Sequence, residues 1–134
     1  MEKKEIAANL QLSGYNCCQA VICPFAEELG VDAQTVFKLA EGFGLGMADM
    51  NGKCGALVGA VMAAGIKNSD GNLDDPKTKG STRKIVKEMT KLFEERVGAS
   101  ICRQIKGVDT GTVLCSCTDC VRNGAVIVQE VLGI

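Results

Sequence analysis

Hydrophobic residues recur along this chain at the three- and four-residue spacing of amphipathic helices, and no segment alternates apolar and polar residues as a half-buried strand would. Start and stop signals divide this pattern into helices at about 3–12, 16–29, 32–40, 53–66, 75–97, 100–107 and 116–132. We therefore expect one all-α domain over residues 1–134, a bundle of about five to seven helices with no sheet.

Local signals at the helix ends support this division. Asn16 and Gln19 have the spacing of a capping box, and Pro24 should kink the helix that they begin. An Asp-Pro pair at Asp75 has the order of a helix start. Side chains that favour the N-cap position are expected to cap four further helices, at Asp32, Asn51, Ser100 and Ser116.

Small residues are concentrated in the middle of the chain. Gly55, Gly59 and Ala63 fall four apart on the expected helix 53–66, so another backbone can approach closely along this stripe. The stripe could serve the core or the interface of a homodimer. Glycines at 42, 44 and 46 predict a turn that gives close backbone approach beside Cys54.

Composition and charge exclude several classes of partner. The 134 residues are 46% hydrophobic and 23% charged, which is typical of a globular protein. A net charge of -1 and only 4% aromatic residues argue against nucleic acid and against a membrane surface as partners. The charged N-terminus lacks the apolar core of a signal peptide, so we expect a cytoplasmic protein.

Sulfur carries the candidate chemistry, because the chain has eight cysteines and no histidine. A chain of this length can bury a core without disulfides. The absence of histidine excludes a Cys2His2 zinc finger and the attachment of c-type haem through C-x-x-C-H. We expect Cys18 and Cys23 to act as small apolar side chains in the core.

Four cysteines fall in the first turns of expected helices: Cys17, Cys54, Cys102 and Cys117. Free backbone N–H groups and the positive end of the helix dipole lower the pKa of a thiol there from its usual value near ~8.5. Cys117 also belongs to a C-x-C-x-x-C group with Cys115 and Cys120, a spacing that can wrap one metal ion or cluster.

Several of these motifs resemble the C_GCAxxG_C_C family of redox-active proteins over nearly the whole chain. The resemblance rests on Asn16-Cys17-x-Gln19-Ala20-Val21, on Gly52-x-Cys54-Gly55-Ala56-x-x-Gly59, on Cys102 and on the terminal cysteine group. It matches Cys17, Cys54 and Cys102 to the first three family cysteines. The fourth is Cys117, with Cys120 and Cys115 as alternatives. The resemblance implies redox activity, and its further likeness to split-Soret cytochromes implies an iron–sulfur centre.

We consider three hypotheses, which leave open whether the protein is an enzyme. In the first, Cys17, Cys54, Cys102 and Cys117 converge to hold an iron–sulfur cluster, with Cys115 and Cys120 as further candidate ligands, and the protein transfers electrons.

The second is a cofactor-free thiol–disulfide protein with Cys54 as nucleophile and Cys17 or Cys102 as resolving partner. The third is a zinc-stabilised interaction module that uses the terminal cysteines. A redox partner protein is expected, and the basic stretch 77–87 could steer it if that partner is acidic.

Overall fold

The computed structural model describes residues 1–134 as helices joined by loops, without a β-strand or sheet. In chain order the elements are α1 (Lys3–Leu12), α2 (Cys17–Ile22), η1 (Cys23–Phe25), α3 (Ala26–Leu29), α4 (Ala33–Ala40), η2 (Glu41–Phe43), η3 (Gly46–Met50), α5 (Gly55–Asn68), α6 (Lys79–Val97), α7 (Cys102–Lys106) and α8 (Cys117–Leu132). Because α2, η1 and α3 follow one another without a loop, they form one kinked helix. The eight α-helical segments therefore make seven units, and the all-α prediction is confirmed.

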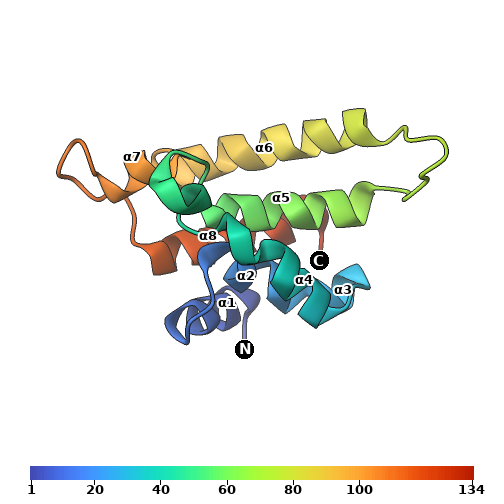
Figure 1. The fold of residues 1–134 in the computed structure, drawn as a ribbon, viewed down its shortest axis with the longest axis horizontal. Coiled ribbons are helices and arrows are strands. Elements are labelled where there is room, and N and C mark those ends of the chain that lie inside the picture. Colours follow the sequence, from blue (N-terminus) through green and yellow to red (C-terminus); the bar gives the residue numbers. More distant parts are fainter.

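The central helix of the bundle is α5. In Figure 1, α6 runs along one side of α5, α8 lies behind it, and α1 to α4 cover the side opposite α6. The largest fully buried side chains come from α2, η1, α5, α6 and α8 and form one core: Ile22, Phe25, Leu57, Met89, Phe93 and Ile127. No helix is both long enough and apolar enough to cross a membrane.

The small-residue stripe of α5 lies against α2 within this core. A Cβ atom added at Gly59 would lie 2.8 Å from the carbonyl oxygen of Cys18 and 2.9 Å from the Cβ of Val21. Gly124 of α8 makes a similarly close approach to the carbonyl oxygen of Ala56, at 2.8 Å. Of the two roles that the sequence left open for the stripe, the structure thus uses it for packing inside the chain.

Three of the predicted caps are formed. The Asn16 side chain accepts a hydrogen bond from the N–H of Gln19 at 2.8 Å, and the Gln19 side chain accepts one from the N–H of Asn16 at 3.0 Å, which completes the capping box. Asp32 and Ser116 cap α4 and α8. The kink expected at Pro24 is present as the 3-10 turn η1, because proline lacks the N–H that an α-helix needs there.

Three predicted helix starts are wrong in position, those of α5, α6 and α7. Asn51 does not cap α5, which begins four residues later with Cys54 at the N-cap. The Asp75-Pro76 pair does not begin α6, which starts at Lys79. In the loop before α6, the Asn72 side chain accepts hydrogen bonds from the N–H groups of Asp74 and Asp75, which keeps residues 72–75 in a turn.

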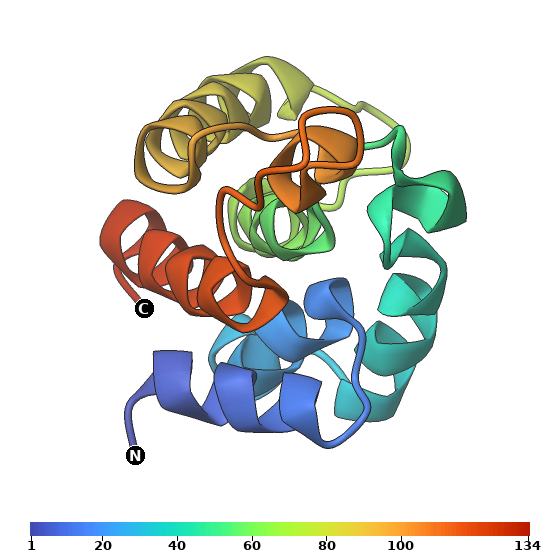
Figure 2. The ribbon, with the colours of Figure 1, turned by 90° about the vertical axis from the view of Figure 1, so that its left-hand side faces the viewer.

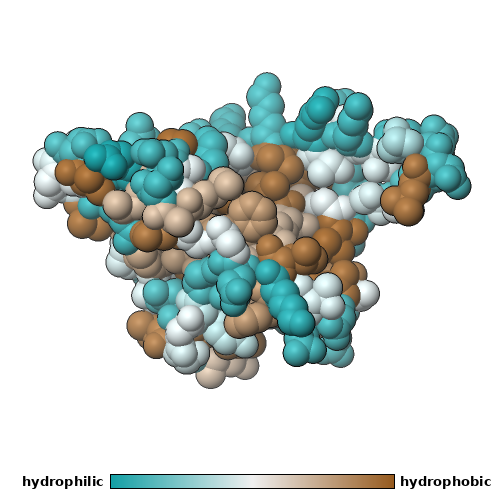
Figure 3. Space-filling model, in the orientation of Figure 1, coloured by the Kyte–Doolittle hydropathy of each residue, from teal (hydrophilic) through white to brown (hydrophobic).

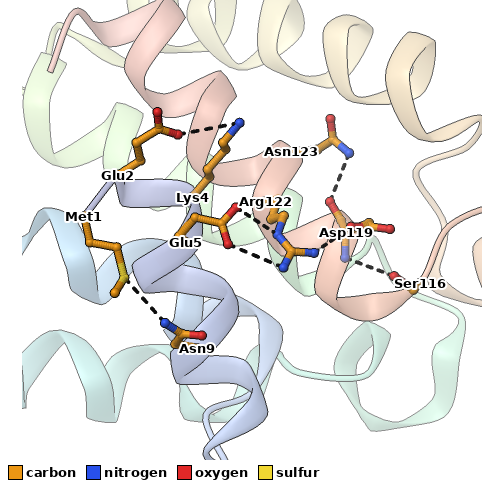
Figure 4. A network of polar contacts seen from close by, with 9 residues as sticks. All are labelled: Met1, Glu2, Lys4, Glu5, Asn9, Ser116, Asp119, Arg122 and Asn123. Carbon is orange, nitrogen blue, oxygen red and sulfur yellow. Dashed lines mark hydrogen bonds and ion pairs between the residues drawn. The ribbon is translucent and has the colours of Figure 1, made fainter.

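Ion pairs fix the start of α8 against α1 (Figure 4). Arg122 pairs with Glu5 of α1 at 3.3 Å and with Asp119 of its own helix at 2.8 Å. Ser116 accepts a hydrogen bond from the N–H of Asp119 at 3.1 Å. These contacts hold the first turn of α8, which carries Cys117, in one position relative to the rest of the bundle.

Candidate functional site

A short antiparallel pairing joins the beginnings of α5 and α7. Lys53 and Ile101 form an isolated β-bridge, the N–H of Cys54 donates to the carbonyl of Ser100 at 2.7 Å, and the N–H of Cys102 donates to the carbonyl of Gly52 at 3.0 Å. The extended backbone here delays the start of α5 until Gly55. It also brings Cys54 and Cys102, 48 positions apart in the sequence, to one end of the molecule.

The same pairing explains why Ser100 does not cap α7, contrary to the sequence prediction. Ile101 is the N-cap of that helix, without a side-chain cap. The Ser100 hydroxyl instead accepts a hydrogen bond from Lys53 at 2.8 Å and donates one to Glu94 at 2.7 Å. Cys102 therefore lies at the first residue of α7, one position earlier in the helix than predicted.

A small cavity lies where these helices begin. Its volume is about 60 Å³. Figure 2 looks at the end of the molecule where α5, α7 and α8 start, with α7 in front of α5 and the start of α8 beside α2. All six cysteines named as candidate site residues line the cavity: Cys17, Cys54, Cys102, Cys115, Cys117 and Cys120. The other lining residues are Leu45, Gly55, Ile105 and Lys106.

The four cysteines of the first turns reach this cavity from four different helices. Cys17, Cys102 and Cys117 are the first residues of α2, α7 and α8, and Cys54 is the N-cap of α5. The structure places all four side chains around one cavity. For Cys54 the predicted position inside the first turn is corrected to the cap.

The two remaining cysteines do not line the cavity. Cys18 is fully buried and its sulfur lies 3.5 Å from that of Met62. Burial raises the pKa of Cys18 to about 12, so its thiol stays protonated at neutral pH. Cys23 is half-buried and packs against the core. Both thus fill space, as predicted.

Two thiol pairs can be distinguished within the cavity. The side chain of Cys17 interacts with that of Cys117, and the side chain of Cys54 interacts with that of Cys120. The first pair is half-buried, whereas Cys54 is 7% and Cys120 only 1% exposed. We call Cys17 and Cys117 the outer pair, and Cys54 and Cys120 the inner pair.

The outer pair contains the most acidic thiol of the site. Interaction with the Cys17 thiol and the charge of Lys106 lower the pKa of Cys117 to about 5. The Lys106 ammonium lies 3.4 Å from the Cys117 sulfur. The pKa of Cys17 is raised, first by its interaction with Cys117 and then by burial. At neutral pH the outer pair therefore holds one thiolate and one thiol.

The inner pair is polarised in the same way. The pKa of Cys54 is lowered by its interaction with Cys120 and by the backbone N–H groups of Ala56 and Leu57. The pKa of Cys120 is raised, chiefly by the interaction with Cys54 and by burial. Backbone N–H groups at the start of α5 thus act on Cys54 as the sequence predicted.

The other two lining cysteines lack such activation. Burial raises the pKa of Cys102 and that of Cys115. Cys115 also interacts with Cys120, whose thiol donates to the carbonyl oxygen of Cys115 at 3.9 Å. Cys102 packs against Gly46, since a Cβ atom added at Gly46 would lie 2.6 Å from the Cβ of Cys102.

A left-handed turn forms one wall of the site. Four residues that are not glycine have a positive φ in this segment, at Leu45, Met47, Ala48 and Met50. Such backbone costs about 1–2 kcal/mol per residue for an L-amino acid. Gly46, which shares this conformation, supplies the close approach expected of the glycine-rich turn. This approach is to Cys102. The turn also approaches the segment beside Cys54, as predicted, since a Cβ atom added at Gly55 would lie 3.1 Å from the carbonyl oxygen of Phe43.

The cysteines fit a metal site by their chemistry but not by their arrangement. Thiolates are the usual ligands of iron–sulfur clusters and of structural zinc, so the donor set fits both groups. No three Cys, Asp or Glu side chains of the chain are arranged to hold one metal ion. The thiols lie instead as interacting pairs around the cavity.

Lys106 was not identified as a site residue from the sequence. The signal that could have found it is its position four residues after Cys102 on a helix, which places both side chains on one face. The pairing of the thiols had no such signal. A second cavity, of about 210 Å³, lies between α5 and α6, but neither a cysteine nor a carboxylate lines it.

Comparison with known proteins assigns the chain to one family. Residues 15–131 match the family described as "Putative redox-active protein (C_GCAxxG_C_C)", and the chain belongs to this family. The match includes all eight cysteines. No curated protein and no solved structure matches the chain.

Proposed function

We propose that this protein is a thiol–disulfide redox protein that works through the outer pair, Cys17 and Cys117. The observation that carries the proposal is the contact between an acidic, partly exposed thiol and a second thiol of raised pKa, beside a lysine at 3.4 Å. Thiol–disulfide exchange needs a thiolate to attack and a neighbouring thiol to resolve the mixed disulfide.

The arrangement suits a two-step exchange with an external disulfide. The Cys117 thiolate attacks one sulfur of that disulfide, a bond forms between them, and the other half leaves as a thiolate. Cys17 then gives up its proton and attacks the Cys117 sulfur, which releases the second half. The external disulfide gains two electrons and the pair Cys17–Cys117 becomes a disulfide.

Cys117 takes the attacking role that the sequence suggested for Cys54. Both thiols have a lowered pKa. Cys54 is only 7% exposed, whereas Cys117 is half-buried, so an external disulfide reaches Cys117 more easily. Cys17 keeps the resolving role, and Lys106 stabilises the Cys117 thiolate by its charge.

Disulfide mapping tests this proposal. After incubation of the reduced protein with oxidised glutathione and alkylation of the remaining thiols, mass spectrometry should find Cys17 linked to Cys117. The Cys17→Ser variant should instead trap glutathione on Cys117, and the Cys117→Ser variant should form no bond at Cys17. Cys23→Ser, outside the cavity, is the control and should behave like the wild type. Failure of the wild type to form any disulfide would refute the proposal.

A second candidate function is electron transfer by an iron–sulfur cluster. It is favoured by the six thiols around one cavity and by the four helix starts that point there. Cys17, Cys54, Cys102 and Cys117 would hold the cluster, with Cys115 and Cys120 as further ligands. A cluster supplies one-electron transfer, and helix N-termini stabilise its negative charge.

Reconstitution decides between the two candidates. Anaerobic protein incubated with iron and sulfide should become coloured and give an EPR signal on reduction if it binds a cluster. Metal analysis of the same protein would reveal any bound zinc. Bound zinc would favour the interaction module instead, since zinc carries no electrons. A colourless product free of iron would eliminate the cluster.

A further inference from the structure

We propose that the inner pair, Cys54 and Cys120, is a second redox centre that exchanges electrons only with the outer pair, so that one chain stores four electrons. The inference rests on the proposed function and extends it, because it makes the outer pair a relay between external disulfides and a buried store.

The first argument is accessibility. Cys120 is 1% exposed and Cys54 is 7% exposed, so neither sulfur can be approached directly by a bulky disulfide. The outer pair is half-buried at the same cavity. An inner pair that can react must therefore do so through a group that already lies within the cavity.

The second argument is proximity between the pairs. Gly55 directly follows Cys54, and a Cβ atom added at Gly55 would lie 3.2 Å from the Cβ of Cys17. The absence of a side chain at Gly55 thus allows the start of α5 to lie directly against Cys17. This contact gives the glycine of the Cys54-Gly55 motif a role in the chemistry as well as in packing.

The third argument is that each pair already consists of two neighbouring thiols. All four side chains line the same cavity of about 60 Å³, in which Cys54 interacts with Cys120 and Cys17 with Cys117. Cys54 lies next to Cys17 through the contact at Gly55. The order Cys120, Cys54, Cys17, Cys117 therefore runs from the two buried thiols to the two partly exposed ones.

The transfer balances as two thiol–disulfide exchanges. When the outer pair is a disulfide, the Cys54 thiolate attacks the Cys17 sulfur, and Cys117 leaves as a thiolate. Cys120 then loses its proton and attacks the Cys54 sulfur, which forms the Cys54–Cys120 disulfide and releases Cys17 to take up a proton. The outer pair is again reduced, the inner pair is oxidised, and a second external disulfide can now react.

Counting thiols during oxidation tests this inference. Reduced wild-type protein in excess oxidised glutathione should lose four thiols per chain in two phases, a fast one and a slower one. Mass spectrometry should then find both the Cys17–Cys117 and the Cys54–Cys120 bonds. Cys120→Ala should lose two thiols in the fast phase alone, while Cys23→Ala, the control, should lose four. This wild-type measurement needs no variant to fold, and circular dichroism checks the helical content of each variant.

The outcomes separate this inference from the proposed function. A wild type that loses only two thiols, with the Cys17–Cys117 bond alone, overturns the inner store and leaves the proposed function intact. A Cys54–Cys120 bond that forms as fast in Cys117→Ser as in the wild type overturns the relay. A Cys115–Cys120 bond, formed instead of the Cys54–Cys120 bond, overturns the assignment of Cys54 to the inner pair. Loss of no thiol at all contradicts the proposed function itself.

Discussion

The eight cysteines of this chain differ more in their surroundings than in their positions along the helices. Cys17, Cys102 and Cys117 are all the first residue of a helix. Of these three, only Cys117 has a lowered pKa, because it interacts with another thiol and with a lysine, while burial raises the pKa of Cys102. A helix start alone does not activate a thiol. The neighbouring charge and the exposure of the sulfur decide which one reacts.

The charge of Lys106 should be measurable in the reactivity of Cys117. With a pKa of about 5, Cys117 is mostly thiolate from pH 6 to 8, so its alkylation by iodoacetamide should be nearly independent of pH there and decline as the pH falls through 5. Lys106→Gln removes the nearest positive charge, so the pKa should rise and alkylation at pH 6 should slow severalfold. Peptide mass spectrometry of timed samples measures this rate.

Lys53→Gln is the matched control for that variant. Lys53 is also a lysine near the start of α5, but it donates to Ser100 and does not line the cavity. Its replacement should leave the pH profile of Cys117 unchanged. An identical profile for Lys106→Gln and the wild type would show that the lysine has no influence on this thiol.

At the scale of the helix, α5 shows why its small residues are needed. One side of α5 packs so closely on α2 that Gly59 has no room for a methyl group, as an added Cβ atom would lie 2.8 Å from a backbone oxygen. Gly65, near the end of the same helix, has open space around it. The two glycines offer an internal comparison.

Alanine substitution should therefore have opposite effects at these two positions. Gly59→Ala must displace the backbone of α2 and should destabilise the fold by about 1–3 kcal/mol, the usual range for overpacking a core. Gly65→Ala meets no clash and should stabilise the fold by up to about 1 kcal/mol, through the higher helix propensity of alanine. Urea denaturation followed by circular dichroism measures both values. Equal effects at the two sites would contradict the close approach of α2 and α5.

At the scale of the whole molecule, the cavity exists only where four helices meet. Its cysteines come from both ends and the middle of the chain, and one end of the molecule carries them (Figure 2). Figure 3 shows hydrophobic surface at the end where α7 and η3 lie, among hydrophilic residues. The exposed apolar residues at this end include Leu45 and Met47, before and within η3. They also include Val108, Val113 and Leu114, which follow α7.

The selective reactivity of Cys117 should therefore disappear when the chain unfolds. In increasing urea at pH 6, the ratio of alkylation at Cys117 to that at Cys23 should fall toward one, with the same midpoint as the loss of helical circular dichroism. A ratio that stays high in unfolded protein would mean that the local sequence, not the cavity, activates Cys117.

Local signals in the sequence determined the elements of this fold. Helical periodicity gave the all-α class, the capping box of Asn16 and Gln19 gave the start of α2, and Pro24 gave the kink after it. These features depend on contacts between residues a few positions apart, which a sequence displays directly. The gathering of Cys17, Cys54, Cys102 and Cys117 was also predictable, since helix starts and a family resemblance pointed to the same positions.

Contacts between distant segments decided the rest. The bridge between Lys53 and Ile101 moved the starts of α5 and α7, because backbone pairing across 48 positions overrode the local caps at Asn51 and Ser100. The partition of the thiols into an outer and an inner pair, and the place of Lys106 beside Cys117, likewise follow from tertiary packing. A pKa depends on burial and on charges a few ångströms away, and the chain order alone contains neither distance.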